Sequence, residues 1–100
     1  MKKVKQFYNK NQFLIEMRNG DLYLQSYESI VAYWDDTHEW LILGTDWNYS
    51  RTTLKHLYLF IETLKHKLNE KTYNEIMTSN NKKQTIHKLL KTGQLTIRDL

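Results

Sequence analysis

The sequence predicts an α+β fold: an N-terminal antiparallel sheet of four to five strands packed by one long helix, then two shorter helices. Two alternating segments, 12–18 and 21–26, flank Asn19-Gly20, a dipeptide typical of tight β-hairpins. After Ser50, apolar residues recur at helical three- and four-residue steps. The chain has 100 residues and no proline, so we expect a single domain, 1–100, with a strand-rich half (1–49) and a helical half (50–100).

The first hairpin should close with a two-residue turn that pairs Met17 with Leu22 and Ile15 with Leu24. Directly paired residues share a face of the sheet. We therefore expect one apolar face and one polar face, made respectively of Phe13, Ile15, Met17, Leu22 and Leu24, and of Glu16, Arg18, Asp21, Tyr23 and Gln25. A further strand is expected at 3–8, with a turn at 9–11.

A second hairpin is predicted from strands 29–34 and 39–44 around the turn 35–38. Pairing Trp34 with Glu39 and Ala32 with Leu41 puts Val31, Tyr33, Trp40 and Ile42 on the opposite face. Both faces of this hairpin are then apolar. Either helices cover both, or one face is an exposed aromatic surface.

The long helix should begin after the N-cap Ser50 and span 51–68. Its inward stripe is apolar and consists of Leu54, Leu57, Tyr58, Ile61, Leu64 and Leu68. A shorter helix should follow Asn69, and a third should cover 82–91 with Gly93 just beyond its end. The tail 95–100 is either a last strand or a docked extended segment.

The amino-acid composition limits the kinds of function that the protein can have. The chain is 40% hydrophobic, which favours a folded protein, and it has no cysteine, which excludes disulfides and thiol chemistry. No apolar run is long enough for a signal peptide or a membrane span, so we expect a soluble cytoplasmic protein without membrane contact. Residues 1–50 carry five Lys/Arg against seven Asp/Glu, and residues 51–100 carry ten against four. This excess in the second half favours an anionic partner or a solvated lysine-rich surface.

The segment 46–56 joins the two halves and places cations at a helix N-terminus, where unpaired N–H groups favour anions. One interpretation is an anion or nucleic-acid site; its residues, including lysines farther along the chain, would be Arg51, Thr52, Thr53, Lys55, His56, Lys65, Lys67, Lys82 and Lys83. The other is that Ser50 and the threonines only cap the helix while Trp47 and Tyr49 pack over its first turn. A separate candidate is an aromatic partner-binding surface of Tyr23, Tyr33 and Trp40, with Trp34 and Trp47 at its rim.

Metal and catalytic sites are not predicted. The four histidines never occur at ligand spacing, so we expect no metal and no cofactor. Ser50 and His56 would lie about 240° apart around a helix axis, which argues against a nucleophile–base pair. Asp35 and Asp36 fall in a turn, where Asp serves local backbone bonding. We therefore expect a protein that is not an enzyme.

Two segments resemble a known group of sequences. Residues 26–32 read Ser-Tyr-x-x-x-Val-Ala, and residues 49–56 read Tyr-Ser-x-Thr-Thr-x-Lys-His. Over about 7–61 the chain resembles short uncharacterised proteins carried by phages and plasmids of Gram-positive bacteria. The resemblance implies a mobile-element origin. Small proteins of such elements often bind nucleic acid or block a host defence complex, as anti-CRISPR proteins do.

These observations lead to two functional hypotheses. The first is a small mobile-element protein whose basic helical half engages nucleic acid or a nucleoprotein complex of the host. The alternative is a protein–protein interaction module, or a homodimer, that uses the aromatic sheet face without contacting nucleic acid.

Overall fold

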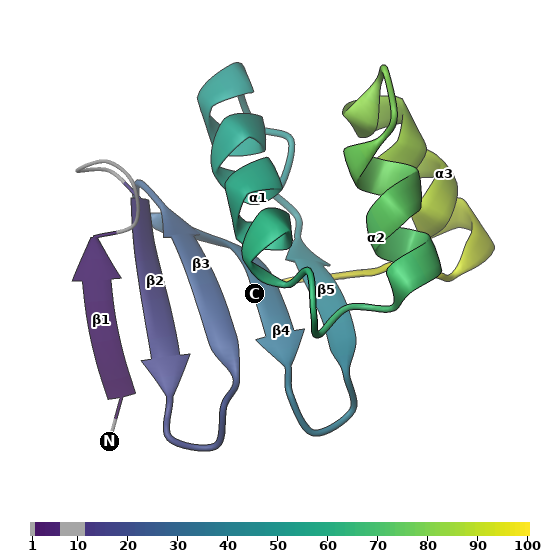
Figure 1. Ribbon diagram of the computed structural model, residues 1–100. Coiled ribbons are helices and arrows are strands. Elements are labelled where there is room, and N and C mark those ends of the chain that lie inside the picture. The colour runs from purple at the N-terminus through teal and green to yellow at the C-terminus, as the bar shows by residue number, and fades with distance from the viewer. Residues whose placement is uncertain (1, 7–11) are drawn as a thin grey trace.

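The computed structural model describes residues 2–6 and 12–100 and has the predicted α+β fold (Figure 1). Five strands form an antiparallel meander: β1 (Lys2–Gln6), β2 (Gln12–Met17), β3 (Leu22–Ser26), β4 (Ser29–Asp35) and β5 (Trp40–Gly44). Three helices follow: α1 (Arg51–Thr63), α2 (Glu70–Met77) and α3 (Lys82–Thr92). The chain then returns as β6 (Thr96–Arg98), parallel to β5 at the edge of the sheet. The predicted turn at 9–11 lies outside the described residues.

The β2–β3 turn is one residue longer than the sequence predicts. Glu16 pairs with Leu22 rather than with Tyr23. The Met17 N–H donates to the Asp21 carbonyl at 2.9 Å, and the Gly20 N–H donates to the Met17 carbonyl at 3.1 Å. Gly20 has a φ of 97°, the left-handed conformation that closes a three-residue turn. The predicted two-residue turn is therefore wrong.

This one-residue difference reverses the faces of β2, because side chains alternate along a strand. Leu14, not Ile15, now pairs with Leu24, and both are buried toward the helices. Ile15 pairs with Tyr23 on the opposite face. The predicted apolar face is thus split: its β2 residues and its β3 residues point to opposite sides, so that Phe13, Ile15 and Met17 are separated from Leu22 and Leu24.

The second hairpin differs from its predicted register by two residues. Trp34 pairs with Leu41 and Ala32 with Leu43, around the turn 36–39. An even shift leaves Trp34 and Leu41 on one predicted face and Tyr33, Trp40 and Ile42 on the other. The pairing of β4 with β3 shifts beside Leu24, which leaves Val31 without a partner in β3 and places it in the core, so its predicted position on the face of Tyr33 is wrong. The backbone comes so close there that a Cβ on Gly44 would collide with the Ile30 carbonyl oxygen.

The core lies between the sheet and the helices, with α1 packed against β3 and β4 (Figure 1). Trp34 is wholly buried in it and Trp47 is 2% exposed, so the prediction that both lie at a rim is wrong. The indole of Trp47 packs edge-on against the His87 ring of α3, with centroids 5.0 Å apart. The remaining buried core residues come from four strands, all three helices, the α1–α2 connection and the segment before β6: Leu14, Leu24, Val31, Ala32, Leu41, Leu43, Leu57, Phe60, Ile61, Leu64, Leu68, Ile76, Ile86, Leu89 and Leu95.

α1 ends at Thr63 rather than at residue 68. Tight turns over residues 64–67 redirect the chain toward α2 while Leu64 and Leu68 stay buried, so the apolar stripe continues beyond the helix. Asn69 and Asn81 accept bonds from the first turns of α2 and α3, and α3 ends at Thr92, with Gly93 just beyond its end as predicted. Within residues 2–6 and 12–100, no helix has the length and apolar character to cross a membrane.

Candidate functional site

The face of the sheet that points away from the helices carries a group of apolar and aromatic side chains. The strand pairings place eight such residues there, and we name this set the helix-free face: Phe13, Ile15, Met17, Tyr23, Ile30, Tyr33, Trp40 and Ile42. None of the eight belongs to the described hydrophobic cluster between sheet and helices. Seven of them are partly or fully exposed, and only Ile42 is buried. The interpretation in which helices cover this side is therefore wrong.

Two tyrosines form the centre of the helix-free face. Tyr23 and Tyr33 are direct cross-strand partners, and their rings stack with centroids 4.6 Å apart and planes 16° apart. The Tyr33 hydroxyl donates to Asp21 Oδ2 at 2.8 Å. Burial, together with this bond to a carboxylate, raises the pKa of the Tyr33 phenol. The rings are thus held in one orientation.

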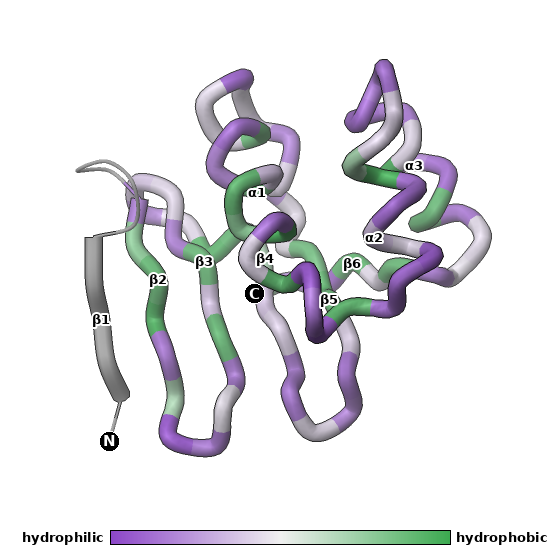
Figure 2. The backbone as a smooth tube through the Cα atoms, viewed as in Figure 1, coloured by the Kyte–Doolittle hydropathy of each residue, from purple (hydrophilic) through white to green (hydrophobic). Residues whose placement is uncertain are grey.

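Trp40 begins β5 at one end of this face, and its side chain is 49% exposed. The two hairpin turns lie beside this end, and they are visibly hydrophilic in Figure 2. The turns and the residues that flank them carry four carboxylates, from Asp21, Asp35, Asp36 and Glu39. Asp21 Oδ1 accepts the backbone N–H of Asp36 at 2.9 Å, which joins the two turns. We call these four residues the acidic turns.

Two carboxylates of the acidic turns are stabilised in their charged form. The backbone and ring of His38 bond to Asp35 and lower the pKa of that carboxyl. The Trp34 indole N–H donates to Asp36 at 3.0 Å and Lys67 approaches to 3.3 Å, which together lower the pKa of Asp36. The negative charge of Asp35, which pairs with Trp40, is therefore fixed by local hydrogen bonds, whereas Asp36 is paired with Lys67.

The sheet-to-helix junction contains the predicted cap. Ser50 Oγ accepts the N–H of Thr53 at 3.1 Å, and Ser50 and Thr53 hydroxyls lie 3.1 Å apart. Tyr49 is 80% exposed, so it does not pack over the first turn as the capping interpretation expected. Arg51, Thr52 and Lys55 are exposed.

Thr53 and His56 do not belong on an anion-binding surface, because they are 3% and 0% exposed. The residue steps from 53 to 56 and from 56 to 60 place them on the buried side of α1 with Phe60. His56 Nδ1 is hydrogen-bonded to Ser26 Oγ at 2.6 Å. Burial, and secondarily the charge of Lys55, lower the pKa of the His56 imidazole. The Ser50–His56 pair considered from the sequence is not formed.

The remaining predicted lysines are divided between two ends of the molecule. Lys65 and Lys67 follow the end of α1, whereas Lys82 and Lys83 begin α3. In Figure 1 the first turns of α1 and α3 lie at one end and the α1–α2 connection lies at the other. The predicted cations thus form two separate groups rather than one continuous surface.

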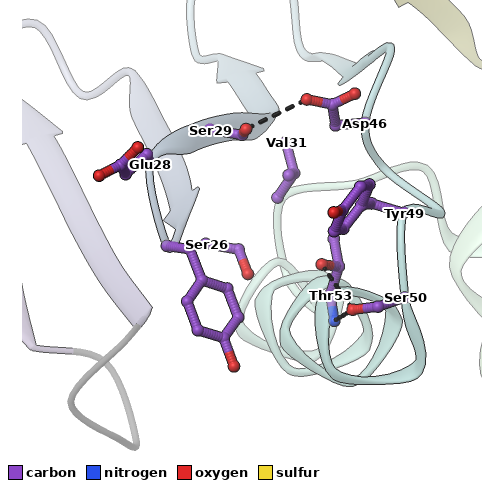
Figure 3. A pocket seen from close by; sticks show the side chains of 9 residues that line it. Ser26, Glu28, Ser29, Val31, Asp46, Tyr49, Ser50 and Thr53 are labelled. Atoms are coloured by element: carbon purple, nitrogen blue, oxygen red, sulfur yellow. Dashed lines mark hydrogen bonds between the residues drawn. The ribbon is translucent and has the colours of Figure 1, made fainter.

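A cavity of about 550 Å³ opens between the β3–β4 turn and the start of α1 (Figure 3). It is lined by residues of both halves of the chain: Ser26, Tyr27, Glu28, Ser29, Val31, Asp46, Tyr49, Ser50 and Thr53. The lining contains two carboxylates and no Lys, Arg or His. We call this cavity the junction pocket. Its charge is opposite to that of the predicted anion site.

A family model described as a family of unknown function (DUF8033) matches residues 1–78. The chain belongs to this family. The match spans β1 to β5, α1 and α2, so the helix-free face and the junction pocket both lie within the DUF8033 segment. No curated protein and no solved structure gave a match.

Sequence reasoning missed most of the junction pocket of this DUF8033 chain. Tyr27 has a φ of 56° in the two-residue turn between Ser26 and Ser29. A side chain in this region costs about 1–3 kcal/mol and occurs mainly where surrounding structure imposes it. The sequence signal that could have located His56 is its position on the buried 53–56–60 side of the helix. Glu28 and Asp46 have no comparable sequence signal, because the turn and the loop meet only in three dimensions.

Proposed function

We propose that this DUF8033 chain is a small, non-enzymatic binding protein that docks a protein partner on its helix-free face. The observation that carries this proposal is the placement of eight apolar or aromatic side chains on the sheet face that the described helices do not cover. A contiguous apolar face of this kind usually marks an interaction surface in a folded domain.

The aromatic residues are suited to anchoring a partner. Tyrosine and tryptophan are enriched among the residues that contribute most to binding, because they bury large areas with few rotatable bonds. The Tyr33–Asp21 hydrogen bond and the Tyr23–Tyr33 stack hold two anchors in place before binding. Little conformational entropy is then lost on association. Trp40, half exposed at the end of the face, supplies a third anchor.

The charges beside the face favour a basic protein over nucleic acid. Asp21 bonds to Tyr33, Asp35 pairs with Trp40 across β4 and β5, and Glu39 directly precedes Trp40, so these carboxylates repel phosphate groups near the face. A partner with apolar residues surrounded by Lys or Arg matches this layout. Its association should therefore weaken with salt mainly through the association rate.

The proposal is tested by affinity capture from nuclease-treated host lysate with matched variants. Tyr33→Ala/Trp40→Ala should lose the partner and retain the helical circular dichroism signal. Arg51→Ala/Lys55→Ala, which changes exposed cations at the start of α1, should retain the partner. Loss of the partner in the second variant alone would contradict the proposal.

Nucleic-acid binding by the helical half is the second candidate, supported by the excess of six positive charges in residues 51–100 and the exposure of Arg51 and Lys55. Non-specific binding of this kind falls steeply with salt. Absence of measurable affinity for single- and double-stranded DNA and RNA at about 50 mM salt would eliminate this candidate.

The sequence resemblance supports a biological setting for either candidate. Small proteins of phages and plasmids often bind nucleic acid or block a host defence complex, so a host defence complex is a fitting protein or nucleoprotein partner. A cytoplasmic location goes with that setting. Survival of a phage or plasmid in a defence-competent host, with and without this chain, measures that role.

A further inference from the structure

The junction pocket has the dimensions and lining of a ligand site that the proposed docking surface does not use. Its volume of about 550 Å³ falls in the range of small-molecule sites, roughly 300–1,000 Å³. From its chemistry we infer that it binds a cationic group, a guanidinium or an ammonium, carried on an alkyl stem.

The charge of the pocket decides the sign of the ligand. Glu28 and Asp46 line it, and no Lys, Arg or His does. Within residues 2–6 and 12–100, the salt bridges are made by Asp35 and Asp36, so no ion pair neutralises Glu28 or Asp46. The Ser29 hydroxyl donates to Asp46 Oδ2 at 3.1 Å, as the dashed line in Figure 3 shows, and this bond orients the carboxylate at the edge of the pocket. Two unneutralised carboxylates favour a positively charged ligand.

The remaining lining fits the other parts of such a ligand. Tyr27 and Tyr49 are 48% and 80% exposed, and aromatic faces attract guanidinium and ammonium groups. Val31 offers an apolar contact for an alkyl stem. Ser26 contributes a buried hydroxyl that is already bonded to His56, which fixes the deep side of the pocket.

The helix N-terminus does not reverse this preference. The Thr53 N–H is bonded to Ser50 Oγ, and the Leu54 N–H is bonded to the Ser50 carbonyl at 3.0 Å. These donors are therefore occupied within the protein. Arg51 and Lys55, the nearest cations in sequence, are absent from the lining. The pocket lining therefore contributes no cation to the predicted anion site.

Two cationic probes represent the two possible sources of the ligand. n-Butylguanidinium represents a free small molecule, and acetyl-Gly-Arg-Gly-amide represents an arginine of a protein partner. Each is titrated into the full-length ¹⁵N-labelled chain, with sodium phosphate as the opposite-charge probe. We expect saturable shifts of amide signals in residues 26–31 and 46–53 with the cationic probes. Tighter binding of the peptide would identify a protein side chain as the natural ligand, and tighter binding of n-butylguanidinium would identify a small molecule.

Charge-neutral variants locate the binding. Glu28→Gln and Asp46→Asn should each weaken the cationic probes by roughly three- to tenfold, as expected for loss of one charge-assisted contact in a partly exposed site. Glu62→Gln removes the same charge from an exposed position of α1 outside the pocket and should leave affinity unchanged. Shifts caused by phosphate but not by the cations would overturn the inference, and so would equal affinity in all three variants. Because the helix-free face contributes nothing to this pocket, either result leaves the proposed protein docking untouched.

Discussion

Replacing neighbouring residues of β2 tests the register of the first hairpin. Leu14 is 7% exposed and belongs to the core between sheet and helices, whereas Ile15 lies partly exposed on the helix-free face. Leu14→Ala and Ile15→Ala remove similar amounts of aliphatic side chain from the same strand. Their costs should differ because only one of them opens a cavity in the core.

The expected magnitudes follow from burial. A buried Leu→Ala change costs about 2–5 kcal/mol, so we expect about 3 kcal/mol for Leu14→Ala. Ile15 is only partly removed from water, and its truncation should cost about 1 kcal/mol. With a urea m-value of about 2 kcal/mol/M, the resulting difference of about 2 kcal/mol separates the two unfolding midpoints by about 1 M.

Equilibrium urea unfolding, followed by circular dichroism at 222 nm, measures both midpoints against the wild-type protein. Similar m-values for the three proteins would show that the midpoints compare stability alone. An Ile15→Ala variant that unfolds at a lower urea concentration than Leu14→Ala would refute the three-residue turn. That outcome would restore the two-residue register expected from Asn19-Gly20.

Three further predictions concern single residues. Gly44→Ala should destabilise the fold by about 2 kcal/mol or more in the same urea assay, because its Cβ would meet the Ile30 carbonyl oxygen, and wild-type stability would contradict that close approach. Tyr27→Gly should raise the free energy of unfolding by about 1 kcal/mol through relief of the positive φ, while weakening the cationic probes; a destabilised variant would show that the tyrosine ring contributes more than its strain costs. For His56, the folded-state pKa is lowered, so the unfolded state binds more protons as pH falls below about 6.5, and stability should decrease from there toward pH 5. His56→Asn should make the urea midpoint depend less on pH, whereas His66→Asn, at an exposed position, should not. Identical pH dependence in wild type and His56→Asn would contradict the assignment of this stability loss to His56.

The sequence predicted the order and type of the first five strands and the three helices, because each has a local signal, and it left the type of the last segment, 95–100, open. Ser50, Asn69 and Asn81 mark helix starts because their side chains accept backbone N–H groups of the first turn. Gly93 marks a helix end because it adopts the left-handed conformation there. The sequence specifies the length of a turn less strongly than it specifies a helix end. Asn-Gly suits a two-residue turn, but Gly20 is also the residue that a three-residue turn needs at its left-handed position.

The faces of the sheet were only partly predictable. In the second hairpin, side chains alternate between the two faces of the sheet. Any even shift in register therefore keeps Tyr33 and Ile42 on one face and Trp34 and Leu41 on the other. Which face the helices cover is decided by tertiary packing, and both faces are apolar. The exposure of Tyr33 and Trp40 therefore could not be derived from pattern alone.

The junction pocket was the least predictable feature. Its two carboxylates come from Glu28 and Asp46, which meet only because the β3–β4 turn folds beside the loop before α1. The cations Arg51 and Lys55 led to the prediction of an anion site at the same junction. Their side chains lie outside the pocket, so the local charge differs in sign from the charge of the segment.

Site-specific photo-crosslinking in host cells tests the central claim, that a protein docks on the helix-free face, most directly. A photoreactive phenylalanine analogue replaces Trp40 in one variant and exposed Lys55 in a matched variant. We predict a discrete, nuclease-resistant protein adduct from position 40 and none from position 55. Adducts formed from position 55 alone, or nuclease-sensitive adducts from either position, would contradict docking on this face.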